Sequence, residues 1–329
     1  MIRIILAFIL SLLFSLATMP FVIRLADKFK AKQPILRYVE SHAVKSGTPT
    51  MGGMGIIVAA ALPFAILLRG DGGTALVCLI VTCGYGIIGF ADDFIKVHFR
   101  RNEGLSAGWK LLLQFAVACA VSAYAFFGTT TRGTLFLPFT FEGVDLSWFA
   151  LPYYVFVFLA FTNSVNLTDG LDGLAASVTF VWLVSFSVLL LVACSFMPSG
   201  EDVNELVLTA CFAGSLLGFL SFNRYPARIF MGDTGSLALG GLAASLAVLT
   251  GHSLSAAILG IMYVLSSVSV MIQVSVFKLT RRRVFLMSPL HHHFEKKGIH
   301  ENHIVAGYTA VTALVGAGVV LFSLVFAAS

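Results

Sequence analysis

The sequence predicts an all-α polytopic membrane protein with about ten transmembrane helices. Three observations support this fold class. Of the 329 residues, 58% are hydrophobic and only 11% are charged, whereas a soluble globular domain carries about 25% charged residues. The mean hydropathy is +0.93. Apolar runs of about 20 residues, long enough to cross a bilayer, recur along the whole chain.

The apolar runs divide the chain into ten expected spans, of which the eighth and ninth are separated only around Gly251–Ser253. The spans are expected at 4–23, 52–68, 74–92, 110–128, 148–165, 173–196, 204–222, 235–251, 255–277 and 304–327. No polar stretch between them is long enough to form a second folded domain. Residues 1–329 are therefore expected to form a single integral membrane domain.

The first span follows Arg3 and could be mistaken for a signal peptide. Its apolar run is long, however, and no small-x-small cleavage site precedes the basic segment that follows it. We therefore expect residues 4–23 to be an uncleaved transmembrane helix.

The basic residues indicate which ends of the helices face the cytoplasm. Of the 21 lysines and arginines, all except Arg3, Arg69 and Arg132 fall in the odd-numbered gaps between spans. By the positive-inside rule these gaps are cytoplasmic, so both termini are expected outside. The formal net charge of +5 is thus a signal of sidedness, and we expect no nucleic-acid partner.

One external gap, Thr129–Ser147, is longer than the others and contains TLFLPFTFEGVDLS. Its alternation of apolar and polar residues predicts a short β-hairpin that turns near Glu142–Gly143. Such a hairpin would cap the helix bundle on the outer side.

Unusual polar residues collect in five segments on the expected cytoplasmic side. These segments are SHAVKSGTPTMGGMG (41–55), DDFIK (92–96), NSVNLTDGLDGLA (163–175), NRYPARIFMGDTGS (223–236) and MSPLHHHFEKKG (287–298). Because all five meet the same face of the membrane, they indicate one composite site.

The carboxylates of these segments suit Mg²⁺, which prefers hard oxygen ligands. They are Asp92, Asp93, Asp169, Asp172 and Asp233. Adjacent carboxylates at a membrane surface repel each other and are costly to desolvate unless a cation lies near them. In addition, GTPTMGG and GDTGS place small residues at expected helix starts, where free N–H groups attract phosphate. The composition therefore predicts a site for phosphate and magnesium.

Taken singly, the same residues have simpler interpretations. Asp92 could pair with Lys96, one helical turn later. Asp169 and Asp172 could stabilise the start of the next helix. The three consecutive histidines (291–293) do not converge easily on one zinc ion, because adjacent helical residues point about 100° apart, and no cysteine lies near them in the sequence.

The five polar segments, taken together and in this order, resemble the family of polyprenyl-phosphate N-acetylhexosamine-1-phosphate transferases. The resemblance covers essentially the whole chain. GFADDFIK and NSVNLTDGLDGLA resemble motifs of the whole superfamily, whereas SHAVKSGTPTMGG and PLHHHFE resemble its muramoyl-pentapeptide branch.

The resemblance implies a reaction. The chain would transfer phospho-MurNAc-pentapeptide from UDP-MurNAc-pentapeptide to undecaprenyl phosphate, giving lipid I and UMP, the first membrane step of peptidoglycan synthesis. It would require Mg²⁺, form a homodimer, and work on the cytoplasmic face of the bacterial inner membrane.

The resemblance also implies roles for individual residues. Catalytic roles fall to Asp92, Asp93, Asp233 and His291, with Asp233 as the metal ligand. Substrate contacts fall to Lys45, Thr50, Lys96, Asn166, Asp169, Gly170, Leu171, Asp172, Asn223, Phe230, His292 and His293. The uracil would lie near 170–172 and against the ring of Phe230. The chain departs from the family pattern at Ser288, where the family has alanine, and in GIHENHIVAGYTAV, which lacks the family's tryptophan.

Two other functions remain open at this point. One is a UDP-GlcNAc:polyprenyl-phosphate GlcNAc-1-phosphate transferase, which would share most of the motifs. The other is a membrane transporter, although transporters hold their ions near the bilayer midplane, whereas the polar residues here gather at one face. The route of transfer, direct attack or a covalent aspartyl-phosphate intermediate, is also open.

Overall fold

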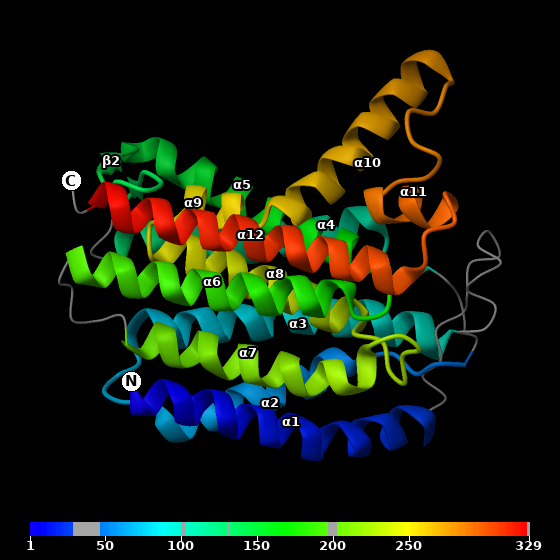
Figure 1. Cartoon of the computed structure of the whole chain (residues 1–329), viewed down its shortest axis with the longest axis horizontal. Coiled ribbons are helices and arrows are strands. Elements are labelled where there is room, and N and C mark those ends of the chain that lie inside the picture. The colour runs from blue at the N-terminus through cyan, green and yellow to red at the C-terminus, as the bar shows by residue number, and fades with distance from the viewer. Residues whose placement is uncertain (29–46, 100–102, 130–131, 197–202, 328–329) are drawn as a thin grey trace.

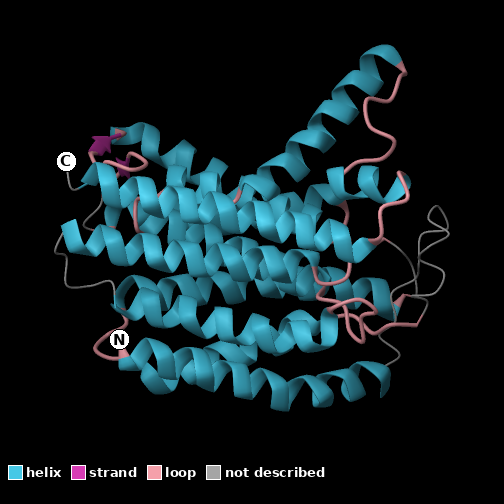
Figure 2. Cartoon of the chain, in the orientation of Figure 1, coloured by secondary structure: helices cyan, strands magenta, loops and turns pink. Residues whose placement is uncertain are grey.

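A computed structural model describes residues 1–28, 47–99, 103–129, 132–196 and 203–327. The described chain is a bundle built almost entirely of helices (Figure 1, Figure 2). The helices are α1 (Ile2–Lys28), α2 (Gly52–Leu67), α3 (Gly73–His98), α4 (Ala107–Phe127), α5 (Ala150–Thr168), α6 (Leu174–Phe196), α7 (Val203–Asn223), α8 (Gly232–Leu249), α9 (Ser253–Leu259), α10 (Ile261–Thr280), α11 (Leu290–Lys296) and α12 (Glu301–Ala327).

The expected class of all-α polytopic membrane protein is confirmed. Among the described residues, nine helices are long and apolar enough to cross a membrane, and the 16-residue α2 is a shorter apolar helix. Each of the ten expected spans coincides with helical structure, and both termini lie at the same end of the bundle (Figure 1).

The ninth expected span, 255–277, is wrong as a single helix. The chain forms α9, breaks at Gly260, and continues as α10, which leans away from the bundle (Figure 1). Gly260 ends one helix by donating its N–H to Ala256 and starts the next by accepting from Tyr263 and Val264. Hydropathy depends on composition and not on the direction of a helix. The apolar run 255–277 is therefore predicted as one span although it contains two helices.

The hairpin is confirmed, but its turn lies earlier than expected. Strand β1 (Thr134–Phe136) pairs antiparallel with β2 (Gly143–Asp145), and Phe136 lies opposite Gly143. Gly143 therefore belongs to the second strand, and the connection is the longer loop 137–142. Phe141 in that loop is buried among core side chains, which explains why the chain does not turn at the glycine. A 3-10 helix, η2 (Ser147–Phe149), leads into α5.

Helix α8 lies at the centre of the bundle, and every residue from Thr234 to Leu249 is buried. Its sequence, GDTGSLALGGLAASLAVL, is rich in small residues, which allow neighbouring helices to approach closely. A Cβ on Gly240 would lie 2.5 Å from the Cα of Thr162 in α5, and one on Gly89 in α3 would overlap the carbonyl of Asp233. This packing fixes the start of α8 beside the last turns of α3.

Candidate active site

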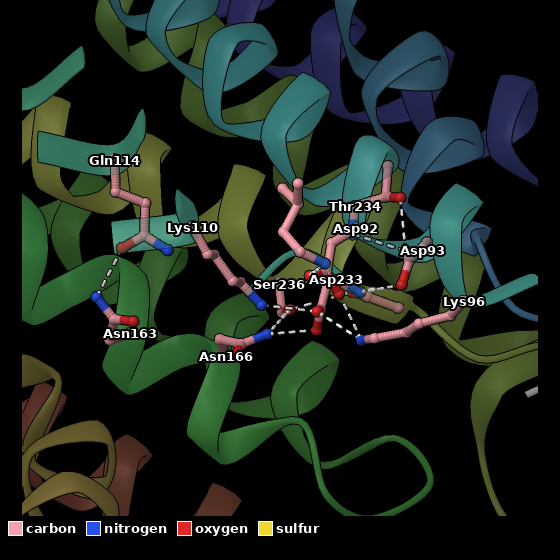
Figure 3. A network of polar contacts seen from close by, with 12 residues as sticks. Asp92, Asp93, Lys96, Lys110, Gln114, Asn163, Asn166, Asp233, Thr234 and Ser236 are labelled. Atoms are coloured by element: carbon pink, nitrogen blue, oxygen red, sulfur yellow. Dashed lines mark hydrogen bonds and ion pairs between the residues drawn. The ribbon is translucent and has the colours of Figure 1, made fainter. Parts of the chain in front are cut away.

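Three carboxylates from two helices meet where α8 begins. Asp92 and Asp93 come from α3 and Asp233 from α8, and one ligand atom of each lies within 4.8 Å of the others. Asp92 and Asp93 are only 2% and 3% exposed. Figure 3 shows the three side chains converging from the two ribbons. Oxygen donors so close together could hold a divalent metal ion.

Asp93 binds the first turn of α8. Its Oδ1 accepts from the backbone N–H of Asp233 at 3.2 Å. Its Oδ2 accepts from the N–H of Thr234 at 2.9 Å and from the hydroxyl of Thr234 at 2.7 Å. A carboxylate at a helix N-terminus satisfies unpaired donors and complements the helix dipole. Asp93 thus acts as a cap supplied by a neighbouring helix.

Gly232, the residue before Asp233, packs closely against the carboxylate of Asp93. Its φ is +74°, and a Cβ there would lie 2.5 Å from Oδ2 of Asp93 and 2.8 Å from the hydroxyl of Thr50. Both the backbone conformation and the lack of space favour glycine. Thr50, an expected substrate contact, therefore lies beside Asp93 and is buried.

Two lysines surround the carboxylate of Asp233. Lys96 Nζ lies 2.8 Å and Lys110 Nζ lies 2.7 Å from its Oδ2. Lys96 also pairs with Asp92 at 2.6 Å, one helical turn back along α3. The expected i, i+4 pair is therefore present, and it is part of a larger network of charges.

The network continues into α5. Asn166 donates through its Nδ2 to Oδ1 of Asp233 and to the hydroxyl of Ser236, both at 2.8 Å. One turn earlier on α5, Asn163 donates to Gln114 of α4 at 2.8 Å. Helices α3, α4, α5 and α8 each contribute polar side chains to this row (Figure 3).

A cavity of about 690 Å³ opens beside this network. Its lining residues are Asp92, Lys96, Glu103, Gly104, Leu105, Ser106, Ala107, Lys110 and Asp233. Three carboxylates, of Asp92, Glu103 and Asp233, and two ammonium groups thus line one space. Such a space can bind a metal ion and phosphate oxygens together.

A second part of the site is the loop of residues 169–173 between α5 and α6. Asp172 accepts from the N–H of Ala227 at 2.9 Å and donates its own N–H to Glu301. Asn223 accepts from the N–H of Gly173 at 3.0 Å and donates to the carbonyl of Ile229 at 2.8 Å. These bonds fasten the loop to the segment 224–231 and to the start of α12.

Asp169 lies in this loop, close enough to the acidic cluster to be affected by it. Burial, together with the negative charges of Asp233, Asp93 and Asp172, raises the pKa of Asp169 to about 8. Burial penalises the ionised carboxyl and like charges repel it. In the absence of a bound cation, Asp169 therefore keeps its proton to a higher pH than an ordinary aspartate does.

The histidines of α11 divide between two neighbourhoods. His291 is fully buried, and its ring lies so close to Gly170 that a Cβ on Gly170 would overlap it. His292 Nδ1 lies 2.9 Å from Glu295, and His293 Nδ1 accepts from the N–H of Leu286 at 3.1 Å. His291 is thus the histidine that reaches the loop 169–173, while His292 pairs with Glu295 of α11 and His293 with Leu286, which precedes α11.

Phe230 joins the remaining expected segment to the site. Its N–H donates to Pro49 at 2.8 Å and its carbonyl accepts from Gly52 at 2.9 Å. GTPTMGG and GDTGS were expected to offer free N–H groups to phosphate at the starts of α2 and α8, and this expectation is wrong. The first N–H groups of α2 donate to the carbonyls of Phe230 and Met231, and those of α8 donate to Asp93. Their glycines serve close packing, since a Cβ on Gly53 would overlap the backbone of Gly235.

The structure thus gathers most expected site residues at one end of the bundle. Asp92, Asp93, Lys96, Asn166 and Asp233 form the charge network. Gly170, Leu171 and Asp172 belong to the loop 169–173, which Asn223 and His291 contact. Lys45 lies outside the described residues.

Sequence reasoning missed three residues of the site. Lys110 looks like an ordinary basic residue at a membrane boundary, and Gly104 and Glu301 belong to no motif. One feature of the sequence could have identified Lys110. This lysine stands alone at the start of an apolar run, and the neighbouring runs carry aspartates at their ends on the same expected side of the membrane.

Comparison with known proteins agrees with this geometry. The sequence profile of glycosyl transferase family 4 matches residues 74–251. A phospho-N-acetylmuramoyl-pentapeptide-transferase of Thermoanaerobacter sp. (strain X514) is 44% identical over 315 residues, which cover 95% of this chain and 96% of the relative. Proteins of the same name are 45% identical over 84% of both chains in Caldanaerobacter subterraneus subsp. tengcongensis, and 40% identical over 91% of this chain and 90% of the relative in Clostridium novyi (strain NT). The chain therefore belongs to glycosyl transferase family 4 and, within it, to the phospho-N-acetylmuramoyl-pentapeptide-transferases.

Proposed function

We propose that the chain transfers phospho-MurNAc-pentapeptide from UDP-MurNAc-pentapeptide to undecaprenyl phosphate, giving lipid I and UMP. The observation that carries this proposal is the cavity in which Asp92 and Asp233 face Lys96 and Lys110 at one end of a bundle of apolar helices. The names of the relatives support the choice of sugar.

The charges in the cavity suit a phosphoryl transfer. Such a reaction needs positioning of the two phosphates and neutralisation of their charge more than it needs covalent help from the protein. Lys96 and Lys110 can each turn an ammonium group from Asp233 to a phosphate oxygen. The acceptor's lipid chain stays in the bilayer, so its phosphate must be met near the helix ends. The cavity is lined there, by the last turns of α3 and the first turns of α4 and α8.

We propose Mg²⁺ as the cofactor. Asp233 and Asp92 would hold it, because both residues line the cavity, whereas Asp93 does not and binds the first turn of α8. When bound, Mg²⁺ supplies positive charge against the diphosphate and the leaving UMP. Lys96 and Lys110 then keep the flanking phosphate oxygens in place.

Asp92 is proposed to orient the reactants and to accept a residual proton. A phosphate monoester has its second pKa near ~6, so the acceptor is already largely dianionic at neutral pH. The alternative is an attack by an aspartate, which would release UMP before the lipid arrives. Exchange of labelled UMP into the nucleotide sugar without lipid acceptor would exclude obligatory direct attack, and the lack of exchange would support it.

The nucleotide is proposed to bind at the second part of the site. The loop 169–173 and Phe230 would contact the uracil, and His291, next to Gly170, would lie close to the sugar diphosphate. Lys45, Thr50, His292 and His293 would complete the contacts. We further propose that the site faces the cytoplasm of a bacterial inner membrane, that residues 1–329 act as one domain, and that the protein works as a homodimer.

Purified protein in detergent tests the function directly. UMP release should require UDP-MurNAc-pentapeptide, undecaprenyl phosphate and Mg²⁺ together. Asp233→Asn should abolish release, whereas Asp71→Asn, a change to an exposed aspartate in the turn before α3, should not.

Two alternatives predict different results in the same assay. UMP release with UDP-GlcNAc in place of the muramoyl substrate would identify the GlcNAc-1-phosphate transferase. The lack of any UMP release, combined with substrate uptake in sealed vesicles, would identify a transporter. Either result would contradict the proposal.

A further inference from the structure

Gly104 and Leu105, shortly before α4, lie directly against Asp92. The backbone N–H of Leu105 donates to Oδ1 of Asp92 at 2.9 Å. The other oxygen, Oδ2, pairs with Lys96 at 2.6 Å. The carboxylate is therefore held from two sides, by a backbone donor on one side and by an ammonium group on the other.

Gly104 makes this approach possible. A Cβ on Gly104 would lie 2.5 Å from Cγ, 2.5 Å from Oδ1 and 2.6 Å from Oδ2 of Asp92. All three distances are well below van der Waals contact, so no side chain fits here unless the carboxylate moves. Asp92 cannot retreat easily, because it is 2% exposed and the next residue, Asp93, is bound to α8.

The same segment also positions Lys110. Ser106 starts α4 by accepting from the N–H of Trp109 through its hydroxyl at 3.4 Å and from the N–H of Lys110 through its carbonyl at 2.9 Å. Residues 103–106 thus connect the carboxylate of Asp92 to the helix that carries Lys110. All four line the cavity.

We propose that residues 103–106 are a positioning element of the transferase site, in which Leu105 fixes the direction of the Asp92 carboxylate and Gly104 provides the space for that contact. The inference rests on the proposed function, since it assigns the element to the transfer step. Neither residue needs to touch a substrate. A misplacement of about 1 Å in a reacting geometry can cost ~100-fold in rate.

Gly104→Ala tests the role of the missing side chain. We expect kcat to fall about tenfold to a hundredfold, because the Cβ displaces Asp92. The KM for UDP-MurNAc-pentapeptide and the unfolding temperature should stay near their wild-type values, because the loop 169–173 is not touched. Gly108→Ala is the matched control, because a Cβ on Gly108 meets nothing within 4 Å.

A second pair of variants tests the backbone donor, and it remains informative if Gly104→Ala fails to fold. Leu105→Pro removes the N–H that binds Asp92, whereas Leu105→Ala keeps it. We expect the proline variant to lose kcat and the alanine variant to retain most of it, at equal unfolding temperatures.

Three outcomes would overturn the inference. The first is a wild-type kcat in folded Gly104→Ala, the second is an equal loss in Gly104→Ala and Gly108→Ala, and the third is equal kcat in the two Leu105 variants. Failure of the proposed function would be seen separately, because the wild-type protein itself would then release no UMP.

Discussion

The ammonium group of Lys110 lies 2.7 Å from the carboxylate of Asp233, although 123 residues separate the two in the chain. Lys110 stands in the first turn of α4 and Asp233 in the first turn of α8. Lys96 contacts the same oxygen from α3. One carboxylate therefore ties the ends of three helices together at the wall of the cavity.

Replacement of Lys110 by alanine should reduce transferase activity strongly. One of the two cations beside Asp233 would be lost from a partly buried cavity, where removal of a single stabilising group typically costs ~100-fold to 1,000-fold in kcat. The measurement is kcat for UMP release. Lys278→Ala, at the exposed end of α10, is the control and should keep near wild-type activity. Similar values for the two variants would refute a role for Lys110.

Replacement of Thr234 by valine should destabilise the protein. The change keeps the size of the side chain but removes the hydroxyl that donates to Asp93 at 2.7 Å. A hydrogen bond to a charged group contributes about 1.5–3 kcal/mol, so the unfolding temperature in detergent should fall. Thr234→Ser restores the donor and should recover most of the loss. If serine proved as harmful as valine, the methyl group would be the important part of Thr234.

Asp169 should make stability depend on pH when no metal is present. Its pKa is raised to about 8 by burial and neighbouring carboxylates, whereas an unfolded aspartate titrates near ~3.9. Between these values the folded chain keeps a proton that the unfolded chain has lost. The free energy of unfolding should therefore fall as pH rises toward about 8, and then level off.

The comparison of wild type with Asp169→Asn measures this effect. In EDTA, the unfolding temperature of the wild type should drop between pH 6 and pH 9, and that of the variant should drop less. Asp71→Asn should follow the wild type. Parallel curves for wild type and Asp169→Asn would show that another group titrates.

Replacement of Gly53 by alanine should separate α2 from α8. The added Cβ would overlap the backbone of Gly235, and overpacking of a tight interior costs about 1–3 kcal/mol. Thermal unfolding of the purified protein measures the loss. Gly84→Ala places the same methyl group on α3 with nothing within 4 Å, and it should leave the unfolding temperature unchanged. A loss shared by both variants would point to a general intolerance of helix substitutions.

Much of the fold could be predicted because hydropathy and sidedness are local properties of a membrane chain. Ten apolar runs marked the helices, and the basic gaps gathered the polar segments on one side. The break at Gly260 was not predicted, because hydropathy does not distinguish one long helix from two consecutive shorter ones. The early turn of the hairpin likewise depends on a tertiary contact, the burial of Phe141.

The residues of the candidate site could be predicted where they belong to recognisable sequence motifs. Asp92, Asp93 and Asp233 stood out as acidic residues at the ends of apolar runs, and the structure brings them together. The glycines of GTPTMGG and GDTGS were misinterpreted, because a glycine that admits a phosphate and one that admits a neighbouring helix look the same in a sequence. Lys110 and Gly104 acquire meaning only through partners distant in space.

Asp92 and Asp93 are consecutive residues with different tasks: one lines the cavity and the other holds the first turn of α8. A screen that scores only product formation would rank substitutions at these two positions alike. Turnover falls when the wall of the cavity changes, and it falls as well when the first turn of α8 is no longer held in place. Protein yield and heat tolerance, measured alongside turnover, would tell the two kinds of damage apart.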